Sequence, residues 1–139
     1  IPAKIGNETA VDLIRRRLPA AGWDDPAKEY IEYFLEAFSI CLENRNYLMH
    51  SGLAWTGTES TVLFRTSKQG KTHAAVPTLD ELRAVADDIH AYCGYGRMLG
   101  NAINIRLSDP PVFSAAAFPW PDKPALPRKL HYSPDLQSR

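Results

Sequence analysis

The sequence predicts a mainly α protein, in which a small bundle of antiparallel long helices carries a β-hairpin insertion and an extended proline-rich C-terminal tail. Two long segments, residues 26–51 and 78–107, place their apolar residues at helical spacing. A short β-branched and aromatic stretch separates them, and seven of the eleven prolines follow the second segment. The chain has 139 residues, 45% of them hydrophobic, which is enough for one buried core.

The first two helices are bounded by residues that favour helix ends. We expect the first to be capped by the segment Asn7-Glu8-Thr9 and to run to about Leu18, because Pro19 cannot continue a helix. The second should begin near Pro26, since proline is tolerated in a first turn. It should run to about Ser51, where Gly52 ends it.

Residues 53–76 lose the helical spacing and predict a β-hairpin. The stretch 61–66 is rich in β-branched and aromatic residues, 68–71 supplies a turn, and 72–76 can return as the partner strand. A third short strand is expected at 53–56.

The third helix begins at a predicted capping box, because Thr78 is followed three residues later by Glu81. Farther along this helix, Gly96 and Gly100 lie one turn apart, at a cost of about 1 kcal/mol each relative to alanine. We expect either the close approach of another helix at these glycines or a kink in the helix near Gly94 to Gly96.

The expected organisation is one helical domain over residues 1–107, with the hairpin at about 53–76, followed by a tail over 108–139. The tail is too rich in proline for regular structure, yet too apolar to be purely solvated. We therefore predict that it packs on the helical domain and buries its large aromatic residues, Phe113, Phe118, Trp120 and Tyr132.

Charge and hydropathy exclude several classes of protein. Sixteen basic residues balance sixteen acidic ones, which argues against a broad electropositive face for duplex nucleic acid, and Arg15–Arg17 is the one local basic cluster. No apolar run approaches the ~18 residues of a membrane span, and no signal-peptide pattern opens the chain. A cytoplasmic protein without a membrane partner is therefore predicted.

The cysteine and histidine residues predict neither a metal site nor a cofactor. Cys41 and Cys93 fall on predicted apolar helix faces, which favours buried thiols in a reducing compartment, although a single disulfide also fits. No paired ligand spacing joins them to the four histidines, His50, His73, His90 and His131.

The end of the second helix carries the most reactive group of side chains, in the segment Arg45-Asn46-Tyr47-Leu48-Met49-His50. At about 100° per residue, with Phe34 as zero, Leu48 and Met49 fall on the apolar stripe that we expect to be buried. Arg45 falls at about 20°, in the middle of this stripe. Asn46 and His50 fall at about 120° and about 160°, one turn apart along its edge. An arginine in an apolar stripe is costly unless it is paired or opens onto a cleft.

An arginine followed by a polar residue, often asparagine, with a histidine four to six residues beyond, resembles the signature of HEPN domains. The resemblance covers the second and third helices and rests on Arg45, Asn46 and His50. It implies a helical and usually dimeric protein, in which two motifs meet across the dimer and many members cut RNA without metal. Three helices are expected here against four or five in the family, so the hairpin and the tail would replace the others.

The resemblance predicts a metal-independent endoribonuclease of the toxin or RNA-processing and defence type, acting as a homodimer. His50 would take the 2′-hydroxyl proton of RNA, because imidazole changes charge near neutral pH. Arg45 would grip the scissile phosphate, and Asn46 would orient the histidine or the phosphate. Expected partners are a second copy, an RNA substrate, and an antitoxin or other protein.

Several alternatives compete with this prediction. The protein fits equally a non-catalytic HEPN-like scaffold that binds a partner protein or a small ligand. Arg45 would then be a core arginine paired with Glu43, Asp87 or Asp88, and His50 a histidine that favours a helix C-terminus.

Two further patterns leave room for other sites. Arg83 and His90 also satisfy the motif spacing, but Ala84 stands where the asparagine is expected. A small-ligand domain would instead show a deep pocket lined by Trp23, Trp55 and Tyr92.

Overall fold

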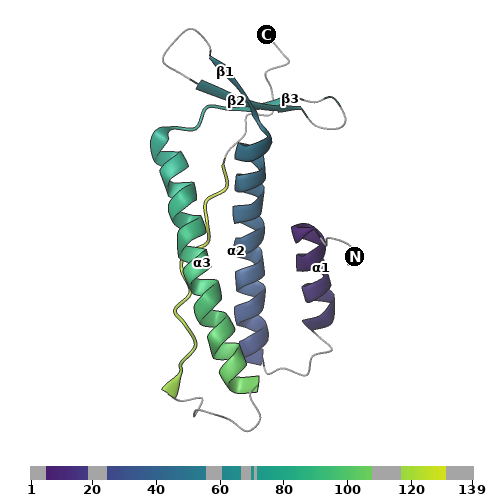
Figure 1. The fold of residues 1–139 in the computed structure, drawn as a ribbon, viewed down its shortest axis with the longest axis vertical. Coiled ribbons are helices and arrows are strands. Elements are labelled where there is room, and N and C mark those ends of the chain that lie inside the picture. The colour runs from purple at the N-terminus through teal and green to yellow at the C-terminus, as the bar shows by residue number, and fades with distance from the viewer. Residues whose placement is uncertain are drawn as a thin grey trace, which may run out of the picture. The chain divides into compact units, whose positions relative to one another are not determined.

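The computed structural model describes residues 6–18, 25–55, 61–66, 70, 72–107 and 117–130. In chain order, the elements are α1 (Asn7–Arg17), α2 (Asp25–His50), β1 (Gly52–Trp55), β2 (Thr61–Thr66), β3 (Thr72–Ala75) and α3 (Leu79–Leu107) (Figure 1). The predicted mainly α class, with a β insertion between two long helices, is confirmed. No helix among these residues is long and apolar enough to cross a membrane.

The chain divides into two compact units, each with one half of α2 and one half of α3. The first unit comprises residues 1–39 and 90–126, and the second comprises 40–89 and 127–139. In the first unit, α2 and α3 run antiparallel, as predicted (Figure 1). Its core contains the buried residues Val11, Leu18, Ile31 and Leu35, with Phe34, Phe38 and Ile103 packed against them.

The start of α3 follows its local sequence signal, whereas the start of α1 does not. Both hydrogen bonds of the predicted capping box are present, from the Thr78 amide to the Glu81 carboxylate (2.6 Å) and from the Glu81 amide to the Thr78 hydroxyl (3.1 Å). The predicted cap in the segment Asn7-Glu8-Thr9 is wrong, because all three residues are already helical and Gly6 occupies the cap position. Pro19 lies outside the described residues.

Gly96 lets α3 approach α2 closely in the first unit. A Cβ atom on Gly96 would lie 2.7 Å from a ring carbon of Phe34 on α2. At Gly94 and Gly100 an added Cβ would meet no described atom within 4 Å. The predicted close approach is therefore confirmed at Gly96 and wrong at Gly100, and α3 continues as one helix through all three positions.

This difference predicts opposite effects of the same substitution one turn apart. Gly96→Ala should lower the free energy of unfolding by about 1–3 kcal/mol, because the added methyl group overpacks the Phe34 ring. Gly100→Ala should raise it by about 0.5–1 kcal/mol, since alanine favours the helix and finds open space. Urea unfolding of the two variants measures both. A stabilising Gly96→Ala would contradict the close packing.

In the first unit, the tail lies against the helices through aromatic contacts. The Tyr92 hydroxyl donates to the carbonyls of Pro124 and Ala125, at 3.0 Å each. Trp120 stacks on Tyr30 with ring centroids 4.9 Å apart. The expected packing of the tail aromatics thus holds for Trp120, whereas Phe118 remains 37% exposed. The other two aromatics, Phe113 and Tyr132, lie outside the described residues.

The second unit contains a three-stranded antiparallel sheet in the order β1-β2-β3. The predicted hairpin and the third short strand are both present, and Gly70 in the second turn has a left-handed φ of 78°. The rest of that turn, residues 67–69 and 71, lies outside the described residues. Leu63 and Ala75 of the sheet form a buried cluster with Tyr47 of α2, so the sheet covers the last turns of that helix.

Candidate functional site

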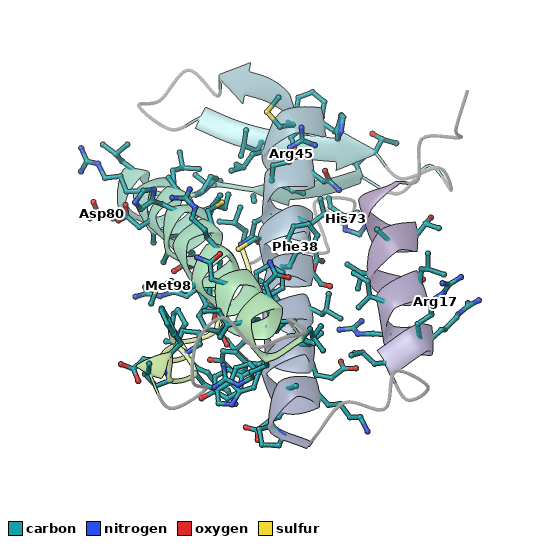
Figure 2. The ribbon with its side chains drawn as sticks, turned by 60° about the horizontal axis from the view of Figure 1, so that its bottom comes forward. Arg17, Phe38, Arg45, His73, Asp80 and Met98 are labelled. Atoms are coloured by element: carbon teal, nitrogen blue, oxygen red, sulfur yellow. The ribbon has the colours of Figure 1, made fainter. Side chains whose placement is uncertain are left out.

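The last two turns of α2 carry all three residues of the Arg45-Asn46-His50 motif, within the second unit. Arg45 and His50 are exposed, and Asn46 is half-buried. Figure 2 shows Arg45 on these turns. The prediction that Arg45 lies in the middle of the buried stripe of α2 is therefore wrong.

The side of α2 that is buried changes along the helix, which explains the error. In the first unit the buried side includes Ile31 and Leu35, and Arg45 would share it if the stripe ran straight. In the last two turns of α2, within the second unit, the buried residues are Asn44 and Tyr47, at 2% and 3% exposure. They lie about 100° and about 160° around the helix from Arg45, which leaves the guanidinium in solvent.

The guanidinium of Arg45 is held by its neighbour and by no carboxylate. Its Nη1 donates to Oδ1 of Asn46 at 3.1 Å. Among the described residues, no acidic side chain lies within ion-pair distance of Arg45, so the alternative pairing with Glu43, Asp87 or Asp88 is absent. Most of the guanidinium donors therefore remain available to an anionic ligand.

His50 stands on a well-anchored turn. The Tyr47 hydroxyl donates to the Leu63 carbonyl at 3.3 Å, which ties the end of α2 to β2. The Ser51 hydroxyl donates to the Tyr47 carbonyl at the same helix end. These two hydrogen bonds fix the backbone of the turn from which the exposed His50 side chain projects.

Met49 is a member of this face that sequence reasoning missed. It was expected in the buried stripe, but it is 64% exposed. Its direction, about 60° on the same projection, falls between those of Arg45 and Asn46. An exposed apolar side chain among polar ones is typical of a contact surface. In the sequence, Met49 has the helical spacing of a core methionine. Its exposure becomes apparent only from the segments that pack on α2 in the folded protein.

In the second segment with the motif spacing, Arg83 to His90, the arginine has an ion-pair partner. Arg83 pairs with Asp80 at 3.4 Å on the first turns of α3. Its guanidinium therefore already faces a carboxylate, unlike that of Arg45. Arg45, Asn46 and His50 remain the better candidates for an anion site.

The metal-ligating residue types do not gather in the described part of the chain. No three histidine, cysteine, aspartate or glutamate side chains there lie as they would around a metal ion. Both cysteines are free. Cys41 is buried, as predicted, whereas Cys93 is exposed, so the prediction that its thiol is buried is wrong.

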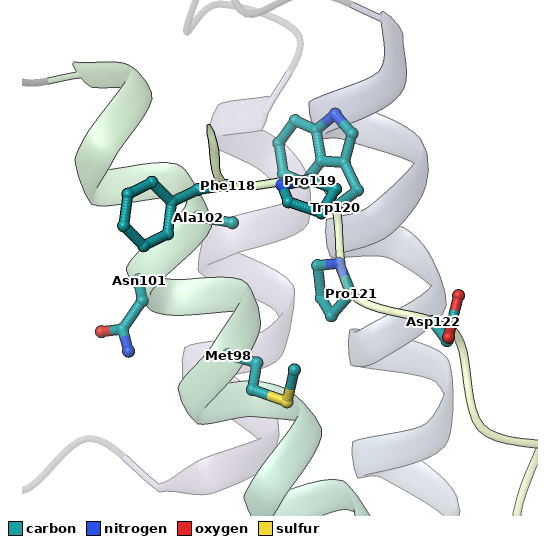
Figure 3. Close-up of a pocket in the computed structure, with 8 residues that line it drawn as sticks. All are labelled: Met98, Asn101, Ala102, Phe118, Pro119, Trp120, Pro121 and Asp122. Carbon is teal, nitrogen blue, oxygen red and sulfur yellow. The ribbon is translucent and has the colours of Figure 1, made fainter. Parts of the chain in front are cut away.

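A separate cavity of about 450 Å³ lies in the first unit, between α3 and the tail (Figure 3). Met98, Asn101 and Ala102 of α3 line one side of it, and the tail residues Phe118 to Asp122 line the other. This is not the pocket expected from the sequence. Tyr92 is buried against the tail, while Trp23 and the side chain of Trp55 lie outside the described residues.

Comparison of the chain with known protein families, with characterised proteins and with solved structures gave no significant match. The function must therefore be argued from the residues themselves and from the motif at the end of α2.

Proposed function

We propose that the Arg45-Asn46-His50 face of α2 is one half of a metal-independent endoribonuclease site of the HEPN-like type. The protein would act as a toxin or in RNA processing or defence. The observation that carries this proposal is the exposed Arg45 guanidinium, oriented by Asn46 and unpaired with any described carboxylate, on the same helix end as the exposed His50. A guanidinium that no described carboxylate occupies can bind the phosphate of a ligand through its N–H groups.

The residues supply each part of an RNA transesterification. Neutral His50 accepts the proton of the ribose 2′-hydroxyl, and the 2′-oxygen then attacks the neighbouring phosphorus. Arg45 stabilises the negative charge that develops on the phosphoryl oxygens. As the bond from phosphorus to the 5′-oxygen breaks, a protonated imidazole returns a proton to that oxygen. The products carry a 2′,3′-cyclic phosphate and a free 5′-hydroxyl.

One motif provides one imidazole, whereas the reaction needs a base and an acid. We therefore propose a two-fold homodimer in which His50 of the second copy supplies the other proton transfer. The exposed Met49 within the face supports such a contact, because burial of its side chain would offset the cost of association.

The direct test is cleavage of RNA by the purified full chain in the presence of a chelator. We expect cleavage to persist and to leave 2′,3′-cyclic phosphate ends, with a dimer in sedimentation at micromolar concentration. Cleavage abolished by the chelator would indicate a metal enzyme. A clean monomer that still cleaves would contradict the shared site.

Arg45→Lys should slow cleavage about tenfold, because an ammonium keeps the charge but loses the bidentate fork. Single-turnover rates measure the effect without a contribution from product release. Arg83→Lys on α3 is the matched control, since it makes the same change at an arginine outside the proposed site. Equal losses in both variants would argue against a special role for Arg45.

A second candidate function is a non-catalytic HEPN-like binding module for a partner protein or a small ligand. The cavity lined by Phe118 and Trp120 in the first unit favours it, because apolar and aromatic walls with a few polar groups are typical of ligand sites. Absence of cleavage of any RNA by well-folded wild-type protein would make this the better account.

A further inference from the structure

Four tyrosines gather on the helices of the first unit, where the tail lies against them. Tyr30 and Tyr33 belong to α2, and Tyr92 and Tyr95 belong to α3. The rings of Tyr33 and Tyr92 stand edge-on to that of Tyr95, with centroids 6.5 Å and 5.9 Å away. This tyrosine cluster offers both ring faces and hydroxyl donors to the segment that covers it.

The tail segment 118–126 lies on the tyrosine cluster at the surface of the first unit. Within this segment only Pro121 is buried, and the other residues are half-buried or exposed. A core segment buries most of its large apolar side chains, whereas Phe118 and Leu126 stay 37% and 40% exposed. Segment 118–126 therefore lies on the helices in the way that a bound peptide does.

The tyrosine cluster binds the backbone of this segment through its carbonyl groups. The Tyr33 hydroxyl donates to the Pro124 carbonyl. The Tyr92 hydroxyl donates to the carbonyls of Pro124 and Ala125, at 3.0 Å each. Proline has no N–H group, so an extended proline-containing segment offers mainly carbonyls to its binding site. Aromatic side chains that contact such a segment are typical of sites for proline-rich peptides.

The side chain of Lys123 supplies an ionic contact between the segment and the cluster. Its ammonium group pairs with the Glu29 carboxylate. The same group lies 4.5 Å and 5.2 Å from the ring centroids of Tyr30 and Tyr33. One carboxylate and two aromatic rings around one ammonium group favour a basic residue at this position of the bound segment.

The Tyr30 ring also contacts Trp120, three residues before Lys123. The two rings are stacked, with centroids 4.9 Å apart. The Arg106 guanidinium of α3 lies 4.0 Å from the centroid of the Trp120 ring. The helices thus contact an aromatic ring, an ammonium group and a proline carbonyl, in the order Trp-x-x-Lys-Pro along the segment.

One buried donor of the tyrosine cluster is not used by the tail. Tyr95 is only 3% exposed, and its hydroxyl has no hydrogen-bond partner among the described residues. Burial and, to a smaller extent, the neighbouring Tyr30 and Tyr33 raise the pKa of this hydroxyl to about 12, so it keeps its proton. A different occupant that brings an acceptor to Tyr95 would gain a hydrogen bond that the tail does not make.

We propose that the tyrosine cluster is a docking site for an extended segment of a partner protein with the pattern Trp-x-x-Lys-Pro. Segment 118–126 occupies this site in the isolated chain and shows the chemistry that a competitor needs. The unused Tyr95 hydroxyl allows such a competitor to bind more tightly than the tail. The inference does not rest on RNA cleavage, because every contact that carries it lies in the first unit.

The test measures the binding of a fluorescently labelled peptide, with the sequence of residues 117–127, to the full chain. In wild-type protein the tethered tail competes with the peptide at an effective concentration on the order of millimolar. Lys123→Ala in the chain removes the ion pair and the ring contacts of the tail, and leaves those of the peptide unchanged. We expect this variant to bind the peptide at least about fivefold more tightly than wild type, because the tail occupies the cluster less often.

The matched control is Lys129→Ala, which removes an exposed lysine of the tail outside segment 118–126. It should change the affinity for the peptide less than about twofold. A second peptide, which itself carries Lys123→Ala, should bind the Lys123→Ala chain at least about fivefold more weakly than the first peptide does. Binding of a scrambled peptide as tight as that of the first peptide would overturn the inference.

Three further outcomes would also overturn it. Equal affinity of the peptide for wild-type and Lys123→Ala protein would place its binding outside the cluster. Absence of binding to Lys123→Ala, at peptide concentrations up to the effective concentration of the tail, would make segment 118–126 a fixed part of the fold. A wild-type dimer that becomes a monomer on Lys123→Ala would assign the cluster to the tail of a second copy. Lys123→Gln, which keeps a long side chain without the charge, serves if the alanine variant folds poorly.

Discussion

Replacing His50 with alanine should lower the rate of RNA cleavage by about 10²–10⁴-fold, the usual loss when a general acid–base group is removed. The side chain is exposed and packs into no core, so its truncation should leave the fold intact. In a homodimer, the change removes the imidazole from both copies at once, and therefore both the base and the acid. Single-turnover cleavage of a labelled RNA measures the rate, and thermal unfolding confirms that the variant is folded.

His90→Ala is the matched control, because His90 is also an exposed helical histidine and belongs to the competing motif. It should cleave RNA at the wild-type rate. Full activity in His50→Ala would remove the assigned base. Loss of activity in His90→Ala instead would transfer the assignment to α3.

Asn44→Ala should lower the free energy of unfolding by about 2–4 kcal/mol. Removal of the amide leaves the Arg128 carbonyl and the Leu130 amide without their partner, and each buried group left unsatisfied costs about 1–3 kcal/mol. The tail segment should then detach more often. Urea unfolding measures the stability, and the rate of tryptic cleavage after Arg128 or Lys129 reports the detachment.

Asn101→Ala provides the comparison, since Asn101 is an exposed asparagine on α3. It should change stability by less than about 0.5 kcal/mol. If Asn44→Ala proved as mild, the two hydrogen bonds would contribute little and the tail would be held by Leu130 and Pro127.

The features that were predicted correctly depend on local sequence. The capping box at Thr78 and the helical spacing of α2 and α3 act within a few residues, so the sequence alone contains them. The β-branched stretch that became β2 is local in the same sense.

The errors concern contacts between distant parts of the chain. Arg45 and Met49 were assigned to the core because the apolar stripe of α2 was extended straight to its end. The sheet and the tail cover a different side of those last turns. Which side a helix buries depends on what packs against it, and no local pattern contains that information.

Asn44 was missed for a related reason. An asparagine inside a helix carries no sequence signal that separates a solvent-exposed side chain from one that holds a tail 84 residues away. The motif residues Arg45, Asn46 and His50 could be named from the sequence, whereas the neighbour that organises the surface beside them could not.

The hydrogen bonds of Asn44 also have a consequence for synthesis of the protein. They join positions 84 and 86 residues apart, so they cannot form until residues 128–130 have left the ribosome. During translation, the side-chain amide of Asn44 therefore stays hydrated until residues 128–130 emerge. Contacts of such long sequence separation are slow to close because of their loop entropy. The packing of residues 128–130 against Asn44 is therefore a late step in the folding of the nascent chain.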